Sequence, residues 1–162
     1  MPNKGFLIAL GLGGAVVAVL IGLVVLKQQG STPRLAGAIT NVRTLGMDES
    51  SSVAIVDFRF VNESRLRFIV QSTGMTLVDS KGETREGQII AAADTNELFK
   101  LFPAIGAKAG ETLIIKNRIE PKESRQVMLA ARFEIPKTEL DSRKSITISV
   151  LEVDGAVSEL SR

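Results

Sequence analysis

The chain has 162 residues and a net charge of +2, which suits one domain with a short additional segment. It has no Cys, His, Trp or Tyr, so disulfides, thiolate chemistry, a cysteine-linked lipid anchor and the usual neutral-pH general base are excluded. Its 20 basic and 18 acidic residues leave little positive excess for gripping phosphates, so no nucleic-acid partner is expected. No pattern indicates a catalytic site, a metal site or a cofactor.

Residues 5–26 read GFLIALGLGGAVVAVLIGLVVL and contain no charged or strongly polar side chain. As a helix this run would measure about 33 Å, against a bilayer core of about 30 Å. We therefore predict that residues 1–26 form an N-terminal transmembrane anchor. The alternative is a cleaved signal peptide, but its apolar region is usually shorter. The nearest small-x-small cleavage triplet, Ala36-Gly37-Ala38, also lies well beyond the run.

Small residues recur at four-residue spacing within the predicted anchor. Gly14, Ala18 and Gly22 would share one helix face, and Ala9 and Gly13 another. Grooves of this kind allow two membrane helices to approach closely, which predicts a contact with another membrane protein or with a second copy of this chain. The plainer interpretation is that Gly and Ala are common in membrane helices.

Residues 27–34 form a polar stretch with Gly and Pro, which predicts a short linker. Positive charges after the apolar run, such as Lys27 and Arg34, favour a cytoplasmic domain under the positive-inside rule. Against this, a very short N-terminal tail is typical of a signal anchor that exports the C-terminal part of its chain. We expect a single-pass protein of the bacterial cytoplasmic membrane with its C-terminal domain outside the cytoplasm.

Residues 35–162 consist of short alternating runs separated by turn signals, which predicts one all-β domain. In the run 53–61, Phe58 and Phe60 are expected to face the core, and Asp57 and Arg59 to face water. A strong hairpin turn is predicted at 79–82. The expected strands cover 38–45, 53–61, 66–71, 75–78, 83–91, 112–119, 125–135 and 145–153. This number and spacing of strands favours a β-sandwich.

One short helix is expected after the fifth strand. Asp94 is predicted to cap its start with Glu97 reaching back, and Pro103 to end it. The apolar side chains of this segment are expected to plug the open end of the sandwich; they are Leu98, Phe99, Leu101 and Phe102.

Several turn motifs follow one another in a fixed order: F-x-N-x-S at 60–64, L-V-D-S-K-G-E at 77–83, I-x-P-K-E-S at 119–124 and R-F-E-I-P at 132–136. In this order the chain resembles the telokin-like immunoglobulin-type domains of bacterial membrane-anchored envelope proteins, over roughly residues 53–155. The resemblance implies an immunoglobulin-like β-sandwich and says little about activity. The chain departs from the pattern at Lys122, where Gly is usual, and in an insertion at 91–110 that offers a place for a function of its own.

Six arginines fall in or between the central strands. Several on one solvent face would meet membrane lipid headgroups or an acidic partner. The plainer interpretation is a solvated sheet face with acidic residues interleaved. The six are Arg59, Arg65, Arg67, Arg118, Arg125 and Arg132.

These observations favour a non-enzymatic single-pass membrane protein that acts as an accessory or structural subunit and presents a β-sandwich for protein–protein interaction. One alternative is a pilin-like filament or secretion-system subunit, since Lys4-Gly5-Phe6 is similar to a prepilin cleavage site. Leu10, however, occupies the fifth mature position, where an acidic residue is expected. The other alternative is a ligand-binding or enzymatic envelope protein that uses a cavity under residues 91–110.

Overall fold

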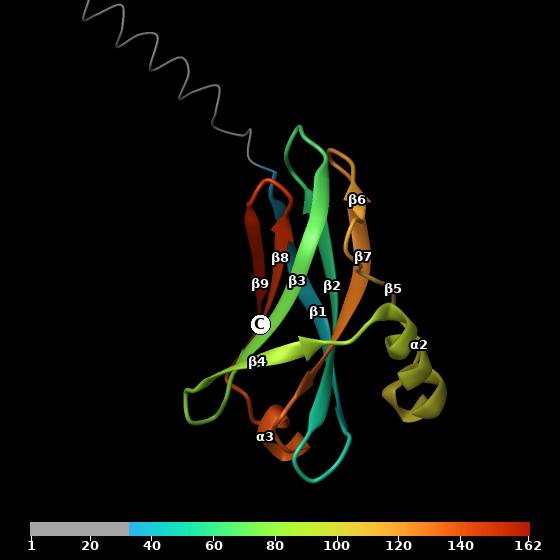
Figure 1. Ribbon diagram of the computed structural model, residues 1–162, viewed down its shortest axis with the longest axis vertical. Coiled ribbons are helices and arrows are strands. Elements are labelled where there is room, and N and C mark those ends of the chain that lie inside the picture. The colour runs from blue at the N-terminus through green and yellow to red at the C-terminus, as the bar shows by residue number, and fades with distance from the viewer. Residues whose placement is uncertain (1–32) are drawn as a thin grey trace, which may run out of the picture. The chain divides into compact units, whose positions relative to one another are not determined.

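The computed structural model describes residues 33–162, which form one compact unit (Figure 1). No helix within these residues combines the length and apolar character needed to cross a bilayer. The predicted anchor at 1–26, with its contact residues Ala9, Gly13, Gly14, Ala18 and Gly22, lies outside the described residues.

The described chain is dominated by strands. In chain order its elements are β1 (Leu35–Gly46), β2 (Ser52–Asn62), β3 (Phe68–Val78), β4 (Thr84–Ile89), α2 (Ala92–Leu101), the 3-10 helix η1 (Pro103–Ile105), β5 (Glu111–Thr112), β6 (Arg118–Ile119), β7 (Ser124–Phe133), α3 (Lys137–Asp141), β8 (Ser145–Glu152) and β9 (Val157–Ser161).

The strands lie in the order β1-β2-β7-β4-β3-β8-β9, with β5 beside β7 and β6 beside β3. Strand β4 belongs to both layers, because Thr84–Gly87 pair with β3 whereas Gln88 and Ile89 pair with β7. On the opposite side, β1 meets β9 through a side chain: the Leu35 N–H donates to Ser158 Oγ at 3.0 Å. The expected all-β, sandwich-like fold is confirmed.

A glycine allows β4 to pass between the two layers. A Cβ atom at Gly87 would lie 2.6 Å from Cζ of Phe133 and 2.9 Å from Cβ of Ala131, closer than packed carbon atoms approach. The side chain of Phe133 therefore fills the space that any larger residue at position 87 would need.

The main core lies between the layers and is built from alternate residues of the paired strands. Phe58 and Phe60 are fully buried in it, as their alternation predicts, with ring centroids 6.0 Å apart. Other large members are Phe68, Met75, Leu77, Phe133, Ile146 and Ile148.

A second apolar cluster covers the outer face of β2 and β7. Val53 and Ile55 point outward from β2, where Leu98 of α2 packs on them. The prediction that this helix plugs the open end of the sandwich is therefore wrong: α2 and η1 lie beside the sheet, as Figure 1 shows. The physical reason is that β2 carries apolar residues on both faces, and the outer one requires a cover.

The start of α2 also differs from its prediction. The cap position is Ala91, which makes no side-chain capping hydrogen bond, and Asp94 lies within the first turn. The Thr95 hydroxyl instead donates to the Ala91 carbonyl at 2.9 Å. The helix ends at Leu101, before Pro103, as predicted.

Several other strand boundaries differ from the predicted ones, because strands pair with partners that are distant in sequence. Strand β3 runs unbroken from Phe68 to Val78 because β8 pairs along nearly all of it, so two predicted strands are one. Leu66, expected inside a strand, is 49% exposed in the preceding loop. The strand expected at 112–119 is mostly loop between β5 and β6, while α3 and β9 were not expected.

The predicted turn after β3 is confirmed. Asp79 is fully buried, and its Oδ1 accepts hydrogen bonds from the N–H groups of Lys81 and Glu83, both at 2.9 Å. Burial acts to raise the pKa of Asp79, but the Glu83 N–H, the Arg85 guanidinium and the Lys81 N–H together hold this pKa below its ordinary value. Gly82 takes the left-handed conformation that closes the turn, with φ of 94°.

Candidate interaction surfaces

Asp57 is buried, against the expectation that it faces water. Only 2% of its side chain is exposed, and Arg43 Nη2 lies 2.8 Å from Oδ1 and 2.9 Å from Oδ2. The periodicity places Asp57 correctly on the outer face of β2, but the segment after α2 covers that face. A buried carboxylate in such a position needs a cation, which Arg43 supplies from the neighbouring strand.

Arg43 also ties the insertion to the sheet. Its Nη1 donates to the carbonyls of Ile105 at 3.3 Å and Ala107 at 2.9 Å. Its guanidinium lies 5.0 Å from the ring centroid of Phe99, within range of a cation–π contact. One side chain thus joins β1, β2, α2 and the loop that follows η1, and this holds α2 in place.

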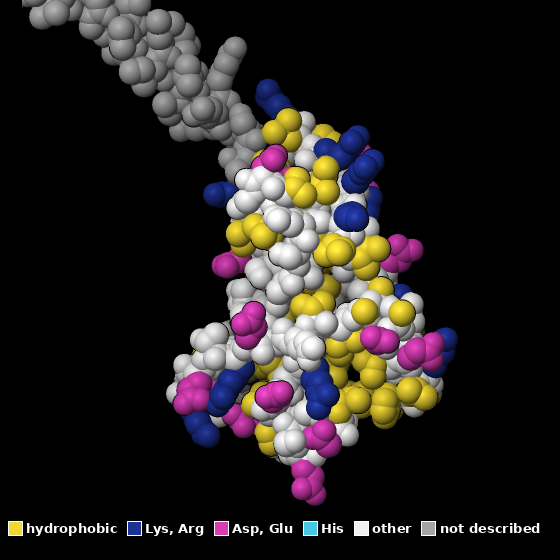
Figure 2. Space-filling model, in the orientation of Figure 1, with side chains coloured by type: hydrophobic (Ala, Val, Ile, Leu, Met, Phe, Trp, Pro, Cys, Tyr) yellow, Lys and Arg dark blue, Asp and Glu magenta, His cyan; other side chains and the backbone are white. Residues whose placement is uncertain are grey.

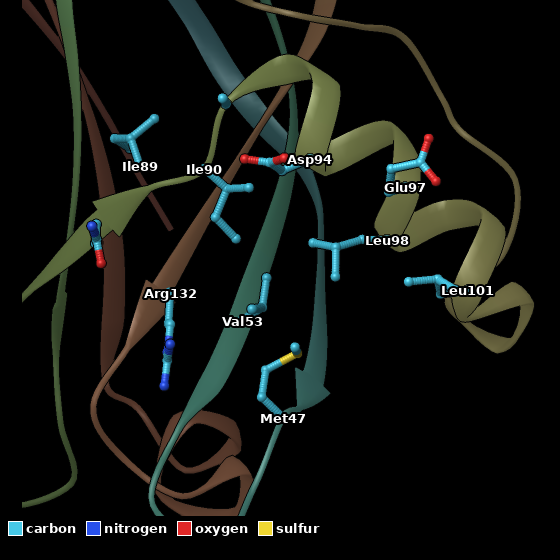
Figure 3. A pocket seen from close by; sticks show the side chains of 11 residues that line it. Met47, Val53, Ile89, Ile90, Asp94, Glu97, Leu98, Leu101 and Arg132 are labelled. Atoms are coloured by element: carbon cyan, nitrogen blue, oxygen red, sulfur yellow. The ribbon is translucent and has the colours of Figure 1, made fainter.

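A groove opens between α2 and the sheet, and Arg43 is not among the residues that line it. It encloses about 470 Å³, within the range of ligand and peptide sites. Figure 3 shows Val53 and Leu98 at its centre, Met47 and Leu101 at its mouth, and Ile90 on the wall formed by the segment after β4. We call it the helix groove; its apolar surface is visible at the lower right of Figure 2.

Charged side chains occupy only the rim of the helix groove. Asp94 and Glu97 are exposed on α2, with Arg132 of β7 across from them. Arg132 is engaged at the β1–β2 loop, where its Nη2 donates to Ser51 Oγ at 3.1 Å and lies 3.7 Å from a carboxylate oxygen of Asp48. This arrangement suits an apolar segment whose flanks are polar.

Within residues 33–162, no group of three or more Asp and Glu side chains is placed to hold a metal ion. The carboxylate of Asp48 is used inside its own loop. Hydrogen bonds from the Ser51 hydroxyl at 2.6 Å and the Ser50 N–H at 2.8 Å hold the pKa of Asp48 at about 2.

The structure distributes the six arginines over different places. Arg132 lies at the rim of the helix groove, and Arg59 projects from β2 opposite Gln126. The other four, Arg65, Arg67, Arg118 and Arg125, are close to the end of the domain at which β1 begins, because β2 ends there and β3, β6 and β7 begin there.

Two of these four arginines are neutralised locally. Arg67 Nε lies 2.7 Å from Glu120, and Arg125 Nε lies 2.6 Å from Glu123. The hydrogen bond from Arg125, with a second from the Glu120 N–H, holds the pKa of Glu123 below its ordinary value. Arg65 and Arg118 are exposed and form no ion pair within residues 33–162.

Lys122 occupies the position at which the resembled domains usually have Gly, and its backbone conformation shows why. It has a φ of 64°, in the left-handed region, and its N–H donates to the Asn62 carbonyl at 2.8 Å. A position with this conformation favours Gly, which is the residue the pattern usually has.

Sequence reasoning offered a cavity under residues 91–110 as one alternative, but it did not identify the other residues that line the helix groove. Its lining comes from the β1–β2 loop, β2, the end of β4, α2 and β7, so no local motif contains it. The one available signal is the insertion at 91–110, which the sequence marks as a place for a function of its own.

Comparison with known proteins assigns no family. No protein-family model matches the chain, and no curated protein matches it. Among solved structures it is similar to an uncharacterized β-sandwich protein from Clostridium difficile, with 12% identity, 81% of this chain and 89% of that chain covered, and a TM-score of 0.42. A conserved hypothetical protein from Bacillus anthracis has 11% identity, coverage of 79% and 88%, and a TM-score of 0.40.

A third similar structure is the archaellum periplasmic stator protein FlaG from Sulfolobus acidocaldarius. It has 11% identity, covers 81% of this chain and 100% of that chain, and has a TM-score of 0.37. At these identities and TM-scores, the three likenesses carry no functional assignment to this chain.

Proposed function

We propose that the chain is a non-enzymatic accessory subunit, anchored by residues 1–26 in a bacterial cytoplasmic membrane, whose helix groove binds an apolar segment of a partner protein. The observation that carries the proposal is the exposed apolar mouth of the groove. Leu101 is 70% exposed and Met47 is 43% exposed, and both border a hollow whose centre is formed by the buried side chains of Val53 and Leu98. Exposed apolar patches with a polar rim commonly mark protein-binding sites.

The position of the groove supports this role. Residue 33 precedes the start of β1, whereas Met47 follows its end. A strand of 12 residues spans roughly 35–40 Å at about 3.3 Å per residue. An anchored domain would therefore carry the groove well away from the point at which its linker joins it.

The order of the strands supports an immunoglobulin-type domain. In constant-type immunoglobulin folds, strands A, B, E and D form one sheet, and C, F and G the other. Here β1, β2, β7 and β4 take the places of A, B, E and D, and β3, β8 and β9 those of C, F and G. The telokin-like relationship remains part of the proposal.

A non-enzymatic role is supported by the chemistry of the groove. Its floor is apolar, and its carboxylates, Asp94 and Glu97, are exposed on the rim. General acid–base catalysis needs a titratable group held within hydrogen-bond reach of a bound substrate, commonly a His, and the chain has no His.

Photocrosslinking in native membranes tests the groove. With a photoreactive residue in place of Leu101, we expect a discrete adduct with one membrane or envelope protein. Changing Met47 to Glu in the same chain is expected to lower the adduct yield about tenfold or more, because an unpaired carboxylate in an apolar contact is costly.

Two controls make this test specific. Met47→Leu keeps the apolar mouth and should keep the adduct. A photoreactive residue at Glu159, exposed on β9 outside the groove, should not form it. Equal adducts from positions 101 and 159, or an adduct that Met47→Glu leaves unchanged, would rule out the groove as the binding site.

Placement of the domain outside the cytoplasm is a separate prediction. A reporter that is active only after export, fused after Arg162, is expected to be active, because the domain resembles those of bacterial membrane-anchored envelope proteins. Activity of a reporter that works only in the cytoplasm would show that the positive charges after the apolar run decide the topology instead.

A further inference from the structure

Exposed apolar side chains gather at the end of the domain where β1 begins. Seven large apolar residues are exposed within residues 33–162, and Met47 and Leu101 of this set border the helix groove. The other five lie in or beside three loops near the start of β1, and we call their end of the domain the proximal surface: Leu66, Ile114, Ile115, Val153 and Val157.

Strand pairing brings these loops together. Leu35, at the start of β1, pairs with Asn62 at the end of β2. Phe68, at the start of β3, pairs with Ile119 of β6, and Val70 pairs with Glu152 at the end of β8. The loops that follow β2, precede β6 and follow β8 therefore lie side by side, at the end where residue 33 joins the domain.

The loop that carries Ile114 and Ile115 is held rigidly. The Lys116 N–H donates to the Val70 carbonyl at 2.7 Å, and the Val70 N–H donates to the Asn117 carbonyl at 3.0 Å. The Ile114 N–H donates to the Asn117 side chain at 3.1 Å. These bonds fix the turn while its two isoleucine side chains remain exposed, at 47% and 59%.

Basic side chains surround these apolar tips. Arg65, Lys116 and Arg118 are exposed and form no ion pair within residues 33–162. Lys122 is also exposed, and its Nζ donates to the Glu63 carbonyl. Of the exposed acidic residues here, Glu120 pairs with Arg67, which leaves Glu63, Asp154 and Glu159, the last beside Arg34 and Val157. Figure 2 shows Lys and Arg side chains gathered with apolar atoms at this end and most carboxylates toward the other.

We propose that the proximal surface docks on anionic lipid headgroups, with its basic side chains at the phosphates and the apolar loop tips at the boundary with the acyl chains. Apolar tips ringed by basic groups match an anionic interface in both charge and polarity. Residues 27–32 reach at most about 20 Å when fully extended, so an anchor at 1–26 would keep this end near the bilayer. The inference rests on the anchoring part of the proposed function and not on the helix groove.

The test uses the full-length protein in lipid nanodiscs. Because the chain has no Cys, a single cysteine gives one labelling site. An environment-sensitive fluorophore is placed at Ile115→Cys on the proximal surface or at Leu101→Cys beside the helix groove. Quenching by a lipid with a nitroxide near its headgroup then reports contact. In discs of phosphatidylcholine mixed with phosphatidylglycerol, we expect strong quenching at position 115 and little at position 101.

Charge variants separate docking from simple tethering. Arg65→Gln combined with Lys116→Gln is expected to lower the ratio of docked to undocked protein roughly 25-fold, at about fivefold for each cation near an anionic surface. Lys81→Gln combined with Lys144→Gln changes the same charge on exposed residues of the β3–β4 turn and the α3–β8 loop, and should have no effect. Discs of phosphatidylcholine alone should resemble the Arg65 and Lys116 variant.

Several outcomes would overturn the inference. Equal quenching at positions 115 and 101, or quenching that ignores both lipid charge and the paired variants, would mean that the domain is tethered without a preferred face. A label at 115 that stays in water in nanodiscs and is shielded only in native membranes would assign the proximal surface to a protein. Failure of the chain to enter nanodiscs would contradict the predicted anchor, and the docking inference would fail with it. Photocrosslinking at position 101 tests the helix groove separately.

Discussion

Replacing Arg43 with Met is expected to lower the free energy of unfolding by about 3–5 kcal/mol, the largest effect expected of any single substitution proposed for this chain. The variant leaves Asp57, which is 2% exposed, with neither its cation nor access to water. It also removes the two hydrogen bonds to the carbonyls of Ile105 and Ala107. Urea denaturation in mild detergent, followed by circular dichroism, measures the change.

The matched control removes both charges. Arg43→Met combined with Asp57→Leu leaves no buried charge unpaired, so we expect it to recover most of the stability lost in the single variant. The carbonyls of residues 105 and 107 still lack their donor, so the groove wall formed by α2 should remain loosened, and adducts from position 101 should fall in both variants. A single variant that loses less stability than the double variant would show that the ion pair does not hold the insertion in place.

Replacing Asn62 with Ala is expected to lower the free energy of unfolding by about 3 kcal/mol and to loosen the proximal surface. Asn62 is fully buried, and its Nδ2 donates to the carbonyls of Leu66 at 2.8 Å and Ile119 at 3.1 Å. Its Oδ1 accepts from the N–H of Ser64 at 3.1 Å and from its hydroxyl at 2.7 Å. Buried groups that lose a partner cost about 1–3 kcal/mol each, and these bonds hold the loop between β2 and β3.

Two measurements separate the local effect of Asn62 from the global one. Denaturation gives the change in stability, while hydrogen exchange should show faster exchange of the Ser64 and Leu66 amides, near the basic loop tips. Asn41→Ala, at an exposed position of β1, is the control and should change little. A loss below about 1 kcal/mol with unchanged exchange would mean that water replaces the Asn62 side chain.

The turn motifs that this chain shares with telokin-like domains have a structural role, because their side chains hold the loops between strands. Asn62 and Ser64 of the F-x-N-x-S motif form one hydrogen-bonded unit. Asp79 and Gly82 of the hairpin motif close the turn after β3. Such motifs specify loops and strand ends, which is why they predict a fold without predicting an activity.

The sequence alone predicted the features that depend on neighbouring residues, namely strand faces, turns and the end of a helix. The period-two alternation placed Phe58 and Phe60 in the core, because side chains of a strand point alternately to its two faces. The turn at Asp79 and the end of α2 before Pro103 follow from turn preferences and from the missing proline N–H. The uncharged run at 5–26 predicts an anchor by composition alone, and that prediction still awaits a test.

Only the tertiary structure decided which faces are covered and which loops meet. Alternation puts Asp57 on the outer face of β2, but its burial depends on α2 and η1 folding back over that face and on Arg43 from β1. The helix groove and the proximal surface likewise join residues far apart in the chain, such as Val53 with Leu98 and Leu66 with Ile114. Periodicity and turn chemistry act over a few residues, whereas these surfaces arise from pairing between distant strands, and that pairing is set by the packing of the whole domain.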